Sequence, residues 1–372
     1  MNIIFTRSFM NLRMGGVTIY VKQLIKHLDD TEFSIINLVG LEKKRFLNAV
    51  ELVNWSNVSI KRDLFLFFIT FPFKIIKHRA DVVHLNPSLE VKGLFRDGFF
   101  LLIGKLFNLK SVVFIHGWNE KTASKIKSCH LFSTIFKMIY NRSDIIVVLA
   151  NEFKHSLREI GLKTKIIVET TMVDDEMVPI KNVYNKCISS NHSNKINILF
   201  LARIERSKGI YEAIDTFVIL RQKYSNIRLI VAGDGNDLSE VKKYVDSIGS
   251  HGIDFIGYIS GKTKEAVLLN SDIYLFPTTY GEGMPISLLE AMALGNAVIT
   301  RYVGGIPDIF INGKNGFITD SKSPDVYARL IEKMILDQSL LRRIGMNNFN
   351  YAQEYFFASK VTKRIESIYL DL

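Results

Sequence analysis

The sequence predicts an α/β protein built from two doubly wound parallel sheets, and two observations indicate this fold class. Short runs rich in β-branched and aromatic residues recur along the whole chain, and a longer amphipathic stretch follows each of them. This alternation is typical of parallel strands whose two faces are covered by helices. A polar segment near the middle separates the runs into two sets. That break favours two Rossmann-like domains over one (β/α)8 barrel, which the strand count alone would also fit.

Six strands are predicted in each half of the chain. In the first half they are Asn2–Phe5, Ser34–Val39, Val82–Asn86, Val112–Ile115, Ile145–Leu149 and Lys165–Val168. In the second half they are Ile198–Ala202, Arg228–Ala232, Ile253–Ile256, Ile273–Phe276, Ala297–Thr300 and Gly316–Ile318. Because most of these runs are continuously apolar, we expect strands that are buried on both faces.

The polar segment is Asp174–Asn194, which is rich in Asn and Ser and shows no helical or strand period. It is therefore predicted to be a linker between domains. We expect an N-terminal domain over residues 1–180 and a C-terminal domain over residues 181–372. The final stretch, residues 350–372, has a helical pattern and is expected to pack back on the N-terminal domain. A ligand shared by two such domains would lie in the cleft between them, at the carboxyl ends of the strands.

The composition excludes several classes of protein. The chain has 372 residues, 48% of them apolar and 23% charged, as in soluble globular proteins. Its two cysteines, Cys129 and Cys187, form no CxxC motif, which argues against a disulfide framework or a zinc site and fits a reducing compartment. Arg7 interrupts the region where a signal peptide would be apolar, and Leu64–Phe73 is shorter than the ~20 residues of a membrane span. We therefore expect a cytoplasmic protein.

The formal charge of +11 indicates an anionic partner, and the excess of Lys and Arg is larger in residues 1–180 than in residues 181–372. A nucleic-acid binder is disfavoured because no RNA- or DNA-reading motif is present. Lys61–Arg79 and Leu94–Lys110 each combine several phenylalanines with Lys and Arg. Such segments suit an anionic membrane surface, which would make the protein peripheral on the cytoplasmic face. Two ordinary core helices with charged ends are the open alternative.

Two glutamates, Glu282 and Glu290, stand eight positions apart in the almost uncharged run Gly281–Thr300. Pro285 suits the first turn of a helix that runs to about Leu294, with Gly295 as its end. Glu282 then lies in a loop and Glu290 in a mostly buried helix, where a carboxylate needs a partner. The alternative is a solvated loop residue and a charge on a helix surface.

The start of that helix exposes backbone amides suited to phosphate or to a sugar oxygen. The residues concerned are Gly283, Met284, Pro285 and Ile286. Arg203 and Lys208 flank a loop that follows another predicted strand, where two cations can neutralise a diphosphate. Solvated surface charges are the alternative for either residue taken singly.

Two more candidates lie in the first half of the chain. Gly15 and Gly16 stand between a strand and a helix that starts near Val17, so their backbone amides can approach a diphosphate closely. A tight turn is the alternative interpretation. His116 lies at the carboxyl end of a predicted strand and is followed by Gly117. It is a candidate for the same cleft, and a structural histidine is the alternative.

These motifs together resemble family 4 of the glycosyltransferases, retaining enzymes of the GT-B fold. Glu282 and Glu290 resemble the family's E-x7-E signature, and Arg203 with Lys208 and Gly209 resembles its R-x4-K-G phosphate motif. The resemblance covers essentially the whole chain. The other matching positions are the glycine loop Gly15-Gly16-Val17, the HG strand end at His116, Gly233-Asp234-Gly235 and Val303–Asp308, in which Asp308 replaces the family's usual Glu.

The resemblance implies a role for each candidate residue. Four residues would have catalytic roles. His116 would lie near the reacting carbon of the donor sugar, and Glu282 would bind the hydroxyls of that sugar. Arg203 and Lys208 would bind the diphosphate. Glu290 would bind the ribose. The remaining donor-binding residues would be Gly15, Gly16, Gly233, Ile256, Tyr258, Gly283, Met284, Pro285 and Ile286, with the backbone at Ile256 and Tyr258 framing the base.

The implied reaction moves a sugar from a UDP- or GDP-linked donor to a lipid-linked saccharide acceptor. Its place would be in surface polysaccharide or glycan biosynthesis. The resemblance implies retention of the anomeric configuration by front-face attack. No cofactor or metal is expected, in agreement with the lack of a D-x-D motif in the sequence. Two alternatives stay open, a GT-B protein that is not a transferase, such as a sugar-nucleotide epimerase, and a basic binding protein without catalysis.

Overall fold

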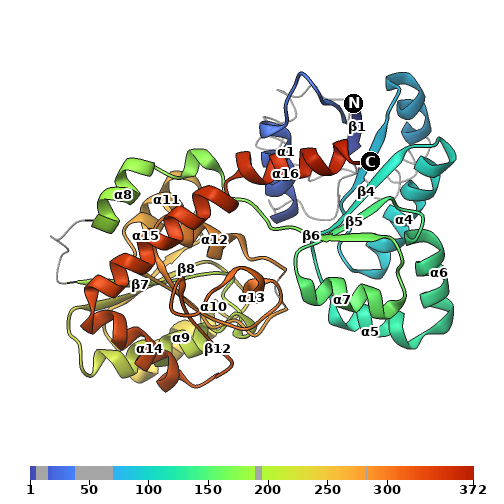
Figure 1. Ribbon diagram of the computed structural model, residues 1–372. Coiled ribbons are helices and arrows are strands. Elements are labelled where there is room, and N and C mark those ends of the chain that lie inside the picture. The colour runs from blue at the N-terminus through green and yellow to red at the C-terminus, as the bar shows by residue number, and fades with distance from the viewer. Residues whose placement is uncertain (6–15, 38–69, 189–194, 282) are drawn as a thin grey trace. The chain divides into compact units, whose positions relative to one another are not determined.

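The computed structural model describes residues 1–5, 16–37, 70–188, 195–281 and 283–372. The chain forms two units, one of Met1–Thr171 together with Val361–Leu372 and the other of Met172–Lys360. In its described part, each unit contains a six-stranded parallel sheet with helices on both faces (Figure 1). All twelve predicted strands are present, and the α/β fold class is confirmed.

The sheet of the first unit has the order β2-β1-β3-β4-β5-β6, so the direction of strand addition reverses between β1 and β3. Its strands are β1 (Asn2–Phe5), β2 (Ser34–Asn37), β3 (Val82–Leu85), β4 (Lys110–Ile115), β5 (Ile145–Val148) and β6 (Lys165–Val168). All described strand pairs are parallel. The strands are apolar throughout because both of their faces are buried.

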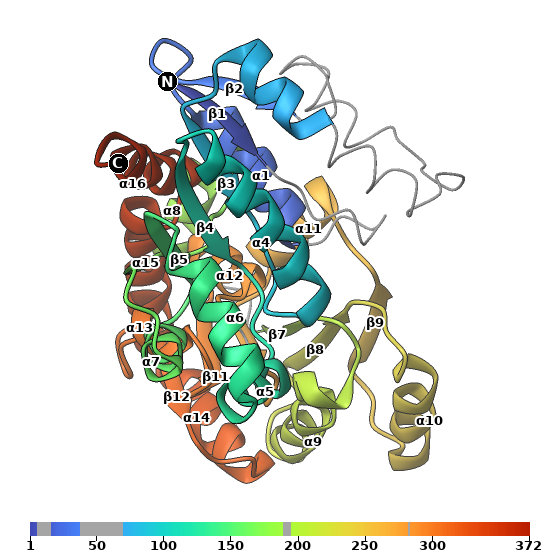
Figure 2. The ribbon, with the colours of Figure 1, turned by 90° about the vertical axis from the view of Figure 1, so that its right-hand side faces the viewer.

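Two sets of helices cover this sheet. They are α1 (Gly16–His27) and α16 (Ala358–Leu370) on one face, and α4 (Val91–Leu106), α5 (Glu120–Ser128), α6 (His130–Tyr140) and α7 (Asn151–Ile160) on the other. Tyr20 of α1 packs on Phe114 of β4, and Tyr369 of α16 contacts His84 of β3. Figure 2 shows α4 and α6 side by side on the opposite face. Residues 70–78 are also helical, and Phe71 packs edge-on against Phe100 of α4.

The sheet of the second unit has the order β12-β11-β10-β7-β8-β9. Its strands are β7 (Ile196–Leu201), β8 (Ile227–Ala232), β9 (Ile253–Gly257), β10 (Ile273–Phe276), β11 (Ala297–Arg301) and β12 (Gly316–Thr319). The chain adds β8 and β9 on one side of β7 and then crosses to β10 on the other side. In open α/β sheets, ligands bind at the carboxyl ends of the two strands where the order reverses. That point lies between β7 and β10.

Helices cover both faces of this second sheet as well. One set is α9 (Ile210–Arg221), α10 (Leu238–Ile248) and α14 (Pro324–Leu336), and the other is α8 (Ile180–Ile188), α11 (Gly261–Leu269), α12 (Ile286–Ala293) and α15 (Gln338–Tyr355). A short helix, α13 (Ile306–Ile309), follows β11. The buried apolar side chains of β7, β8 and β10 form one core with α9 and α14.

The prediction of a linker over Asp174–Asn194 is wrong for the residues of this segment that the structure describes. Residues Asp175–Met177 form the 3-10 helix η1, and α8 follows at Ile180. Val183 and Cys187, four positions apart, are its buried residues. Cys187 packs so closely on Gly295 (φ 71°) that a Cβ there would lie 2.8 Å from its sulfur. This two-residue stripe is too short to show a helical period among polar neighbours.

The limits of the two units also differ from the expected ones. The first division falls at Thr171, not at residue 180, so α8 belongs to the second unit. Of the final stretch, only Val361–Leu372 belongs to the first unit, while α15 stays with the second. Arg364 of α16 is held in the first unit by two hydrogen bonds to the Glu169 carboxylate, at 2.7 and 2.8 Å.

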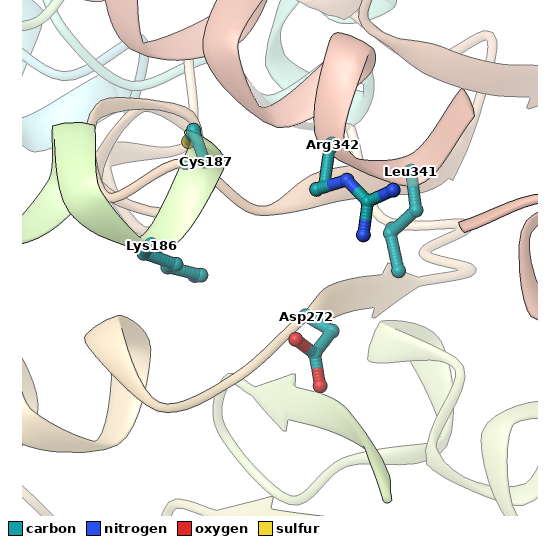
Figure 3. A pocket seen from close by; sticks show the side chains of 6 residues that line it. Lys186, Cys187, Asp272, Leu341 and Arg342 are labelled. Atoms are coloured by element: carbon teal, nitrogen blue, oxygen red, sulfur yellow. The ribbon is translucent and has the colours of Figure 1, made fainter. Parts of the chain in front are cut away.

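Lys186 of α8 joins the carboxyl ends of two helices. Its buried ammonium donates to the carbonyl oxygens of Ser271 (2.5 Å) and Leu294 (3.0 Å), which follow α11 and α12. Burial lowers the pKa of Lys186 to about 8. A cavity of about 20 Å³ lies beside it, lined also by Asp272 and Arg342 (Figure 3). It has room for about one water and lies at the amino ends of β10 and β11, so it is not the site expected at the strand carboxyl ends.

None of the helices in the described ranges combines the length and the apolar character that a membrane crossing needs.

Candidate functional site

The loop after β7 carries the two cations predicted to hold a diphosphate. Ile204 is fully buried beneath this loop, and the 3-10 helix η2 (Arg206–Lys208) leads into α9. Gly209, between η2 and α9, has a φ of 84°, in the left-handed region. A Cβ on this residue would lie 2.4 Å from the carbonyl oxygen of Pro277, which follows β10. Glycine is therefore required here for the close approach of the loops after β7 and β10.

The two cations differ in burial. The Arg203 side chain is 58% exposed, and its guanidinium pairs with the Glu205 carboxylate at 2.6 Å. Lys208 is only 7% exposed. The interpretation as a solvated surface charge fits Arg203 but not Lys208, because a buried ammonium needs compensating interactions.

The loop after β10 is hydrogen-bonded to the turn that carries Lys208. The backbone N–H groups of Thr279 and Tyr280 both donate to the Ser207 carbonyl oxygen, at 2.9 and 3.1 Å. The ring of Tyr280 lies under both cations, with its centroid 3.9 Å from Lys208 Nζ and 5.8 Å from Arg203 Cζ. Sequence reasoning missed Tyr280. The signal was present, since loops that follow neighbouring parallel strands meet at the same edge of a sheet.

Helix α12 begins at Ile286, one position later than predicted. Pro285 is the N-cap, because its ψ of 117° is extended and its carbonyl accepts from the N–H groups of Leu288 and Leu289. The amides of the first turn are the positive end of the helix dipole. Of the neighbouring candidates, Met284 is buried and the Gly283 carbonyl accepts from Gly305 at 2.8 Å. Glu282 lies outside the described residues.

Glu290 is buried inside α12, so its interpretation as a helix-surface charge is wrong. It is 6% exposed, and its Oε1 accepts from Lys264 Nζ of α11 at 2.5 Å. Burial raises the pKa of Glu290, and the neighbouring ammonium of Lys264 opposes that shift. Lys264 was not among the predicted site residues. No local signal identifies it, because it lies 26 positions earlier in the chain.

The remaining candidates of the second unit lie at the ends of β8 and β9. The Gly233 N–H donates to the Gly257 carbonyl at 2.8 Å, which joins the loops after these two strands. Ile256 and Tyr258 are 39% and 71% exposed. Arg203, Lys208 and these residues thus lie at the carboxyl ends of one sheet.

In the first unit, His116 follows β4 and is 8% exposed. Its ring stacks on Phe114 with a centroid distance of 4.1 Å, and Nε2–H donates to Asn86 Oδ1 at 2.9 Å. Burial and the neighbouring His84 lower the pKa of His116 to about 3. The ring is therefore neutral at pH 7 and can accept or donate hydrogen bonds but cannot supply a proton. Asn86, at the end of β3, is a second residue that sequence reasoning missed.

The predicted glycine loop is only partly described. Gly16 is the exposed first residue of α1, and Gly15 lies outside the described residues. In the part of the chain that the structure describes, no three His, Cys, Asp or Glu side chains are grouped so that they could hold a metal ion.

Comparison with known proteins identifies the family. Residues 186–351 match the family model described as glycosyl transferases group 1. The chain is 30% identical over 353 residues to the capsular polysaccharide biosynthesis glycosyltransferase CapM of Staphylococcus aureus, which covers 90% of this chain and 88% of CapM. It is 23% identical over 406 residues to the alpha-monoglucosyldiacylglycerol synthase of Acholeplasma laidlawii, with 99% and 96% covered.

Solved structures agree on the fold. The crystal structure of Anabaena HepE in complex with UDP-glucose is similar with a TM-score of 0.74 and 17% identity, and the alignment covers 100% of both chains. Such neighbours have the GT-B fold, in which two parallel-sheet α/β domains make up the chain. The chain therefore belongs to the glycosyl transferases group 1 and is a glycosyltransferase of the GT-B fold.

Proposed function

We propose that this glycosyltransferase transfers a sugar from a nucleoside diphosphate sugar, UDP- or GDP-linked, to a saccharide acceptor, without a metal ion. The observation that carries the proposal is the position of Arg203 and Lys208. Both follow β7, where the strand order of the second sheet reverses, and the loop after β10 packs against them. A diphosphate needs concentrated positive charge, and this end of the sheet supplies it beside the amino end of α12.

Each part of the donor has a candidate partner. Arg203 and Lys208 bind the diphosphate, Glu290 accepts the ribose hydroxyls, and the backbone at Ile256 and Tyr258 frames the base. The transferred sugar contacts Glu282 and His116. The residues that complete the donor site are Gly15, Gly16, Gly233, Gly283, Met284, Pro285 and Ile286.

The Arg203–Glu205 pair does not block this role. Exposed ion pairs contribute about 0–1 kcal/mol, and the Arg203 side chain is 58% exposed. A diphosphate carries more negative charge than one carboxylate, so it can take over or share the guanidinium.

In the proposed reaction, the bond between the anomeric carbon and the leaving phosphate oxygen breaks as the acceptor oxygen bonds to that carbon. The acceptor oxygen attacks from the face that the phosphate leaves, and its proton passes to that phosphate. Because bond making and bond breaking take place on one face, the sugar keeps its anomeric configuration. Negative charge grows on the diphosphate and positive charge grows on the sugar. Fixed cations stabilise the first without reorganising during the reaction. A neutral His116 ring stabilises the second better than an imidazolium would.

For the acceptor, we propose a lipid-linked saccharide in surface polysaccharide or glycan biosynthesis, reached at the cytoplasmic face of a membrane. The relatives named above act, by their names, in capsular polysaccharide biosynthesis and in the synthesis of a glucosyldiacylglycerol. The first unit supplies a matching surface. Its exposed large apolar side chains on residues 70–78, α4 and α6 are Phe73, Ile76, Phe95, Phe99, Leu106, Leu131 and Met138, called here the aromatic surface.

Contacts within the first unit support this surface. Phe95 of α4 stacks on Phe132 of α6 at 5.9 Å. The exposed positions of α4 are Lys92, Phe95, Phe99 and Leu106, which recur at helical spacing and form one stripe. Apolar side chains next to Lys and Arg bind anionic lipid surfaces. Of the two segments predicted for this role, residues 61–69 of Lys61–Arg79 lie outside the described range.

The test is acceptor-dependent release of nucleoside diphosphate. Purified protein in EDTA is first screened by thermal shift against UDP- and GDP-sugars, since a ligand at 100 times its Kd stabilises by about 2.7 kcal/mol. The stabilising donor is then incubated with and without lipid-linked saccharides. We expect release only with an acceptor. Equal release without any acceptor would contradict transfer to a saccharide, and conversion of the donor into another nucleotide sugar would favour an epimerase instead.

A further inference from the structure

The inference concerns Tyr280, in the loop after β10, and it rests on the proposed diphosphate site. The backbone of this residue is hydrogen-bonded to the loop after β7, which carries Arg203 and Lys208. The N–H groups of Thr279 and Tyr280 share the Ser207 carbonyl as acceptor, and Ser207 is the residue before Lys208. The position of the Tyr280 ring is therefore coupled to the position of the lysine.

The ring itself contacts both cations. Lys208 Nζ lies 3.9 Å from the ring centroid and Arg203 Cζ lies 5.8 Å from it, both within the ~6 Å over which a cation is attracted to an aromatic face. Tyr280 is 43% exposed, while Lys208 is 7% exposed. The ring thus lies between a buried ammonium and solvent, where the attraction is less screened than at a fully exposed site.

Arg203 and Lys208 are like charges at one strand end, and Glu205 pairs with the Arg203 guanidinium there. An aromatic face attracts both cations without adding a negative charge that would compete with the ligand. A second carboxylate in place of the ring would also attract the cations, but it would add to the negative charge of Glu205 and would repel the diphosphate. The Tyr280 ring is suited to hold the two cations ready for an anion.

We propose that Tyr280 is a positioning residue, whose ring holds Arg203 and Lys208 in the arrangement that binds the donor's diphosphate. The ring acts through the cations and does not itself react. Its effect is therefore confined to ligands that carry phosphates. Nucleoside binding, which depends on Glu290 and the end of β9 in the proposed site, does not need it.

The experiment compares Tyr280→Leu, which removes the ring, with Tyr280→Phe, which keeps the ring and removes only the hydroxyl. Tyr184→Leu is the matched control, because Tyr184 is a 50% exposed tyrosine on α8 of the same unit. Calorimetric titration in EDTA measures the Kd of UDP, GDP, uridine and guanosine for each protein. Lys208→Met is measured in parallel.

We expect Tyr280→Leu to weaken binding of the nucleoside diphosphate about 10-fold, the sum of two cation–aromatic contacts. Tyr280→Phe and Tyr184→Leu should bind it within about 3-fold of the unchanged protein, and nucleoside affinity should be equal in all of them. Diphosphate affinity unchanged in Tyr280→Leu, or lost equally in Tyr280→Phe, would overturn the inference. If Lys208→Met alone loses affinity, only the role of Tyr280 fails. If no variant changes diphosphate binding, the proposed diphosphate site fails as well.

Discussion

The carboxyl ends of the two sheets are chemically different although the two units share one architecture. At the ends of β3 and β4 in the first unit, the candidate group is a neutral, buried His116 bonded to Asn86. At the ends of β7 and β10 in the second unit, the candidates are the cations Arg203 and Lys208. The carboxyl ends of the two sheets therefore carry different chemistry, although the sheets are built alike.

The difference follows the chemistry of a nucleotide sugar. A diphosphate needs positive charge, which is effective when it is fixed and partly desolvated. Sugar hydroxyls need hydrogen-bond donors and acceptors and no net positive charge, and a buried histidine with a pKa of about 3 provides them without charge. We therefore propose that the cations of the second unit bind the diphosphate, and that His116 of the first unit is one of the groups that bind sugar hydroxyls. The predictions below test this division, beginning with the largest expected effect.

Removing a cation of the second unit should have the largest effect. Arg203→Ala or Lys208→Ala should lower turnover by about 10²–10³-fold, the usual loss when one fixed group that stabilises developing charge is removed. Lys262→Ala is the control, since Lys262 is an 84% exposed lysine of the same unit. Steady-state rates in EDTA provide the measurement. Full activity in the alanine variants, together with a strict need for a divalent ion, would rule out the proposed binding of the diphosphate by Arg203 and Lys208.

The second effect concerns the two glutamates of the E-x7-E run. Glu290→Gln should weaken nucleoside diphosphate binding by about 10–100-fold, because hydrogen bonds to a charged group are lost and Lys264 loses its carboxylate. Glu282→Gln should lower turnover instead and leave that affinity nearly intact. Titration calorimetry and initial rates separate the two variants. The assignment fails if both variants show unchanged turnover, or if the glutamates exchange these effects.

Much of the fold and part of the candidate site could be predicted from the sequence. Continuous apolar runs identified all twelve strands, because strands buried on both faces leave an unmistakable pattern. The loop after β7 is predicted because it follows an apolar strand run, and the spacing of Arg203, Lys208 and Gly209 resembles the R-x4-K-G motif. Helix α8 was missed because only Val183 and Cys187 are buried in it, too few to reveal a helical period.

The partners of the site residues were harder to predict than the residues themselves. Lys264 reaches Glu290 from another helix, and Asn86 reaches His116 from another strand. Such contacts depend on the order of strands in the sheet, which a single sequence does not display. The Pro285 error has a different cause. Proline is favoured at the first position of a helix, and only the backbone angles show that Pro285 lies one position before it.

The third effect is a pH dependence that belongs to the first unit. Burial lowers the pKa of both His84 and His116 to about 3, below the ordinary value of 6.5. Between these values the unfolded chain binds more protons than the folded one, so the free energy of unfolding falls as the pH falls below 6.5. Each histidine contributes at most about 1.4 kcal/mol per pH unit.

Denaturant unfolding at pH 7 and pH 5 measures this effect. The drop in unfolding free energy should be smaller in His116→Gln than in the unchanged protein, because one of the two neutral histidines is gone. His116 should cause no inflection in the pH profile of turnover between pH 5 and 8, so the profile of His116→Gln should have the same shape as that of the unchanged protein. An inflection near pH 6.5 that disappears in this variant would mean that His116 titrates in the folded protein, contrary to its buried, neutral state.

The smallest effect is expected at the aromatic surface. Phe73→Ser with Phe99→Ser should weaken binding to vesicles that contain phosphatidylglycerol several-fold, since each side chain is already partly exposed and inserts only in part. Added salt should weaken binding further by screening. Leu336→Ser, at a 73% exposed leucine of the second unit, is the control. Vesicle binding that is unchanged by both the substitutions and the salt would contradict the proposed membrane surface.

One measurement tests the division between the two units most directly. The affinity for the nucleoside diphosphate and the turnover of its sugar are measured side by side for Lys208→Met and His116→Gln. Lys208→Met should lose diphosphate affinity and turnover together, whereas His116→Gln should lose turnover and bind the diphosphate as tightly as the unchanged protein. Equal loss of diphosphate affinity in the two variants would contradict the account, because the charge of the second unit would then not be what binds the diphosphate.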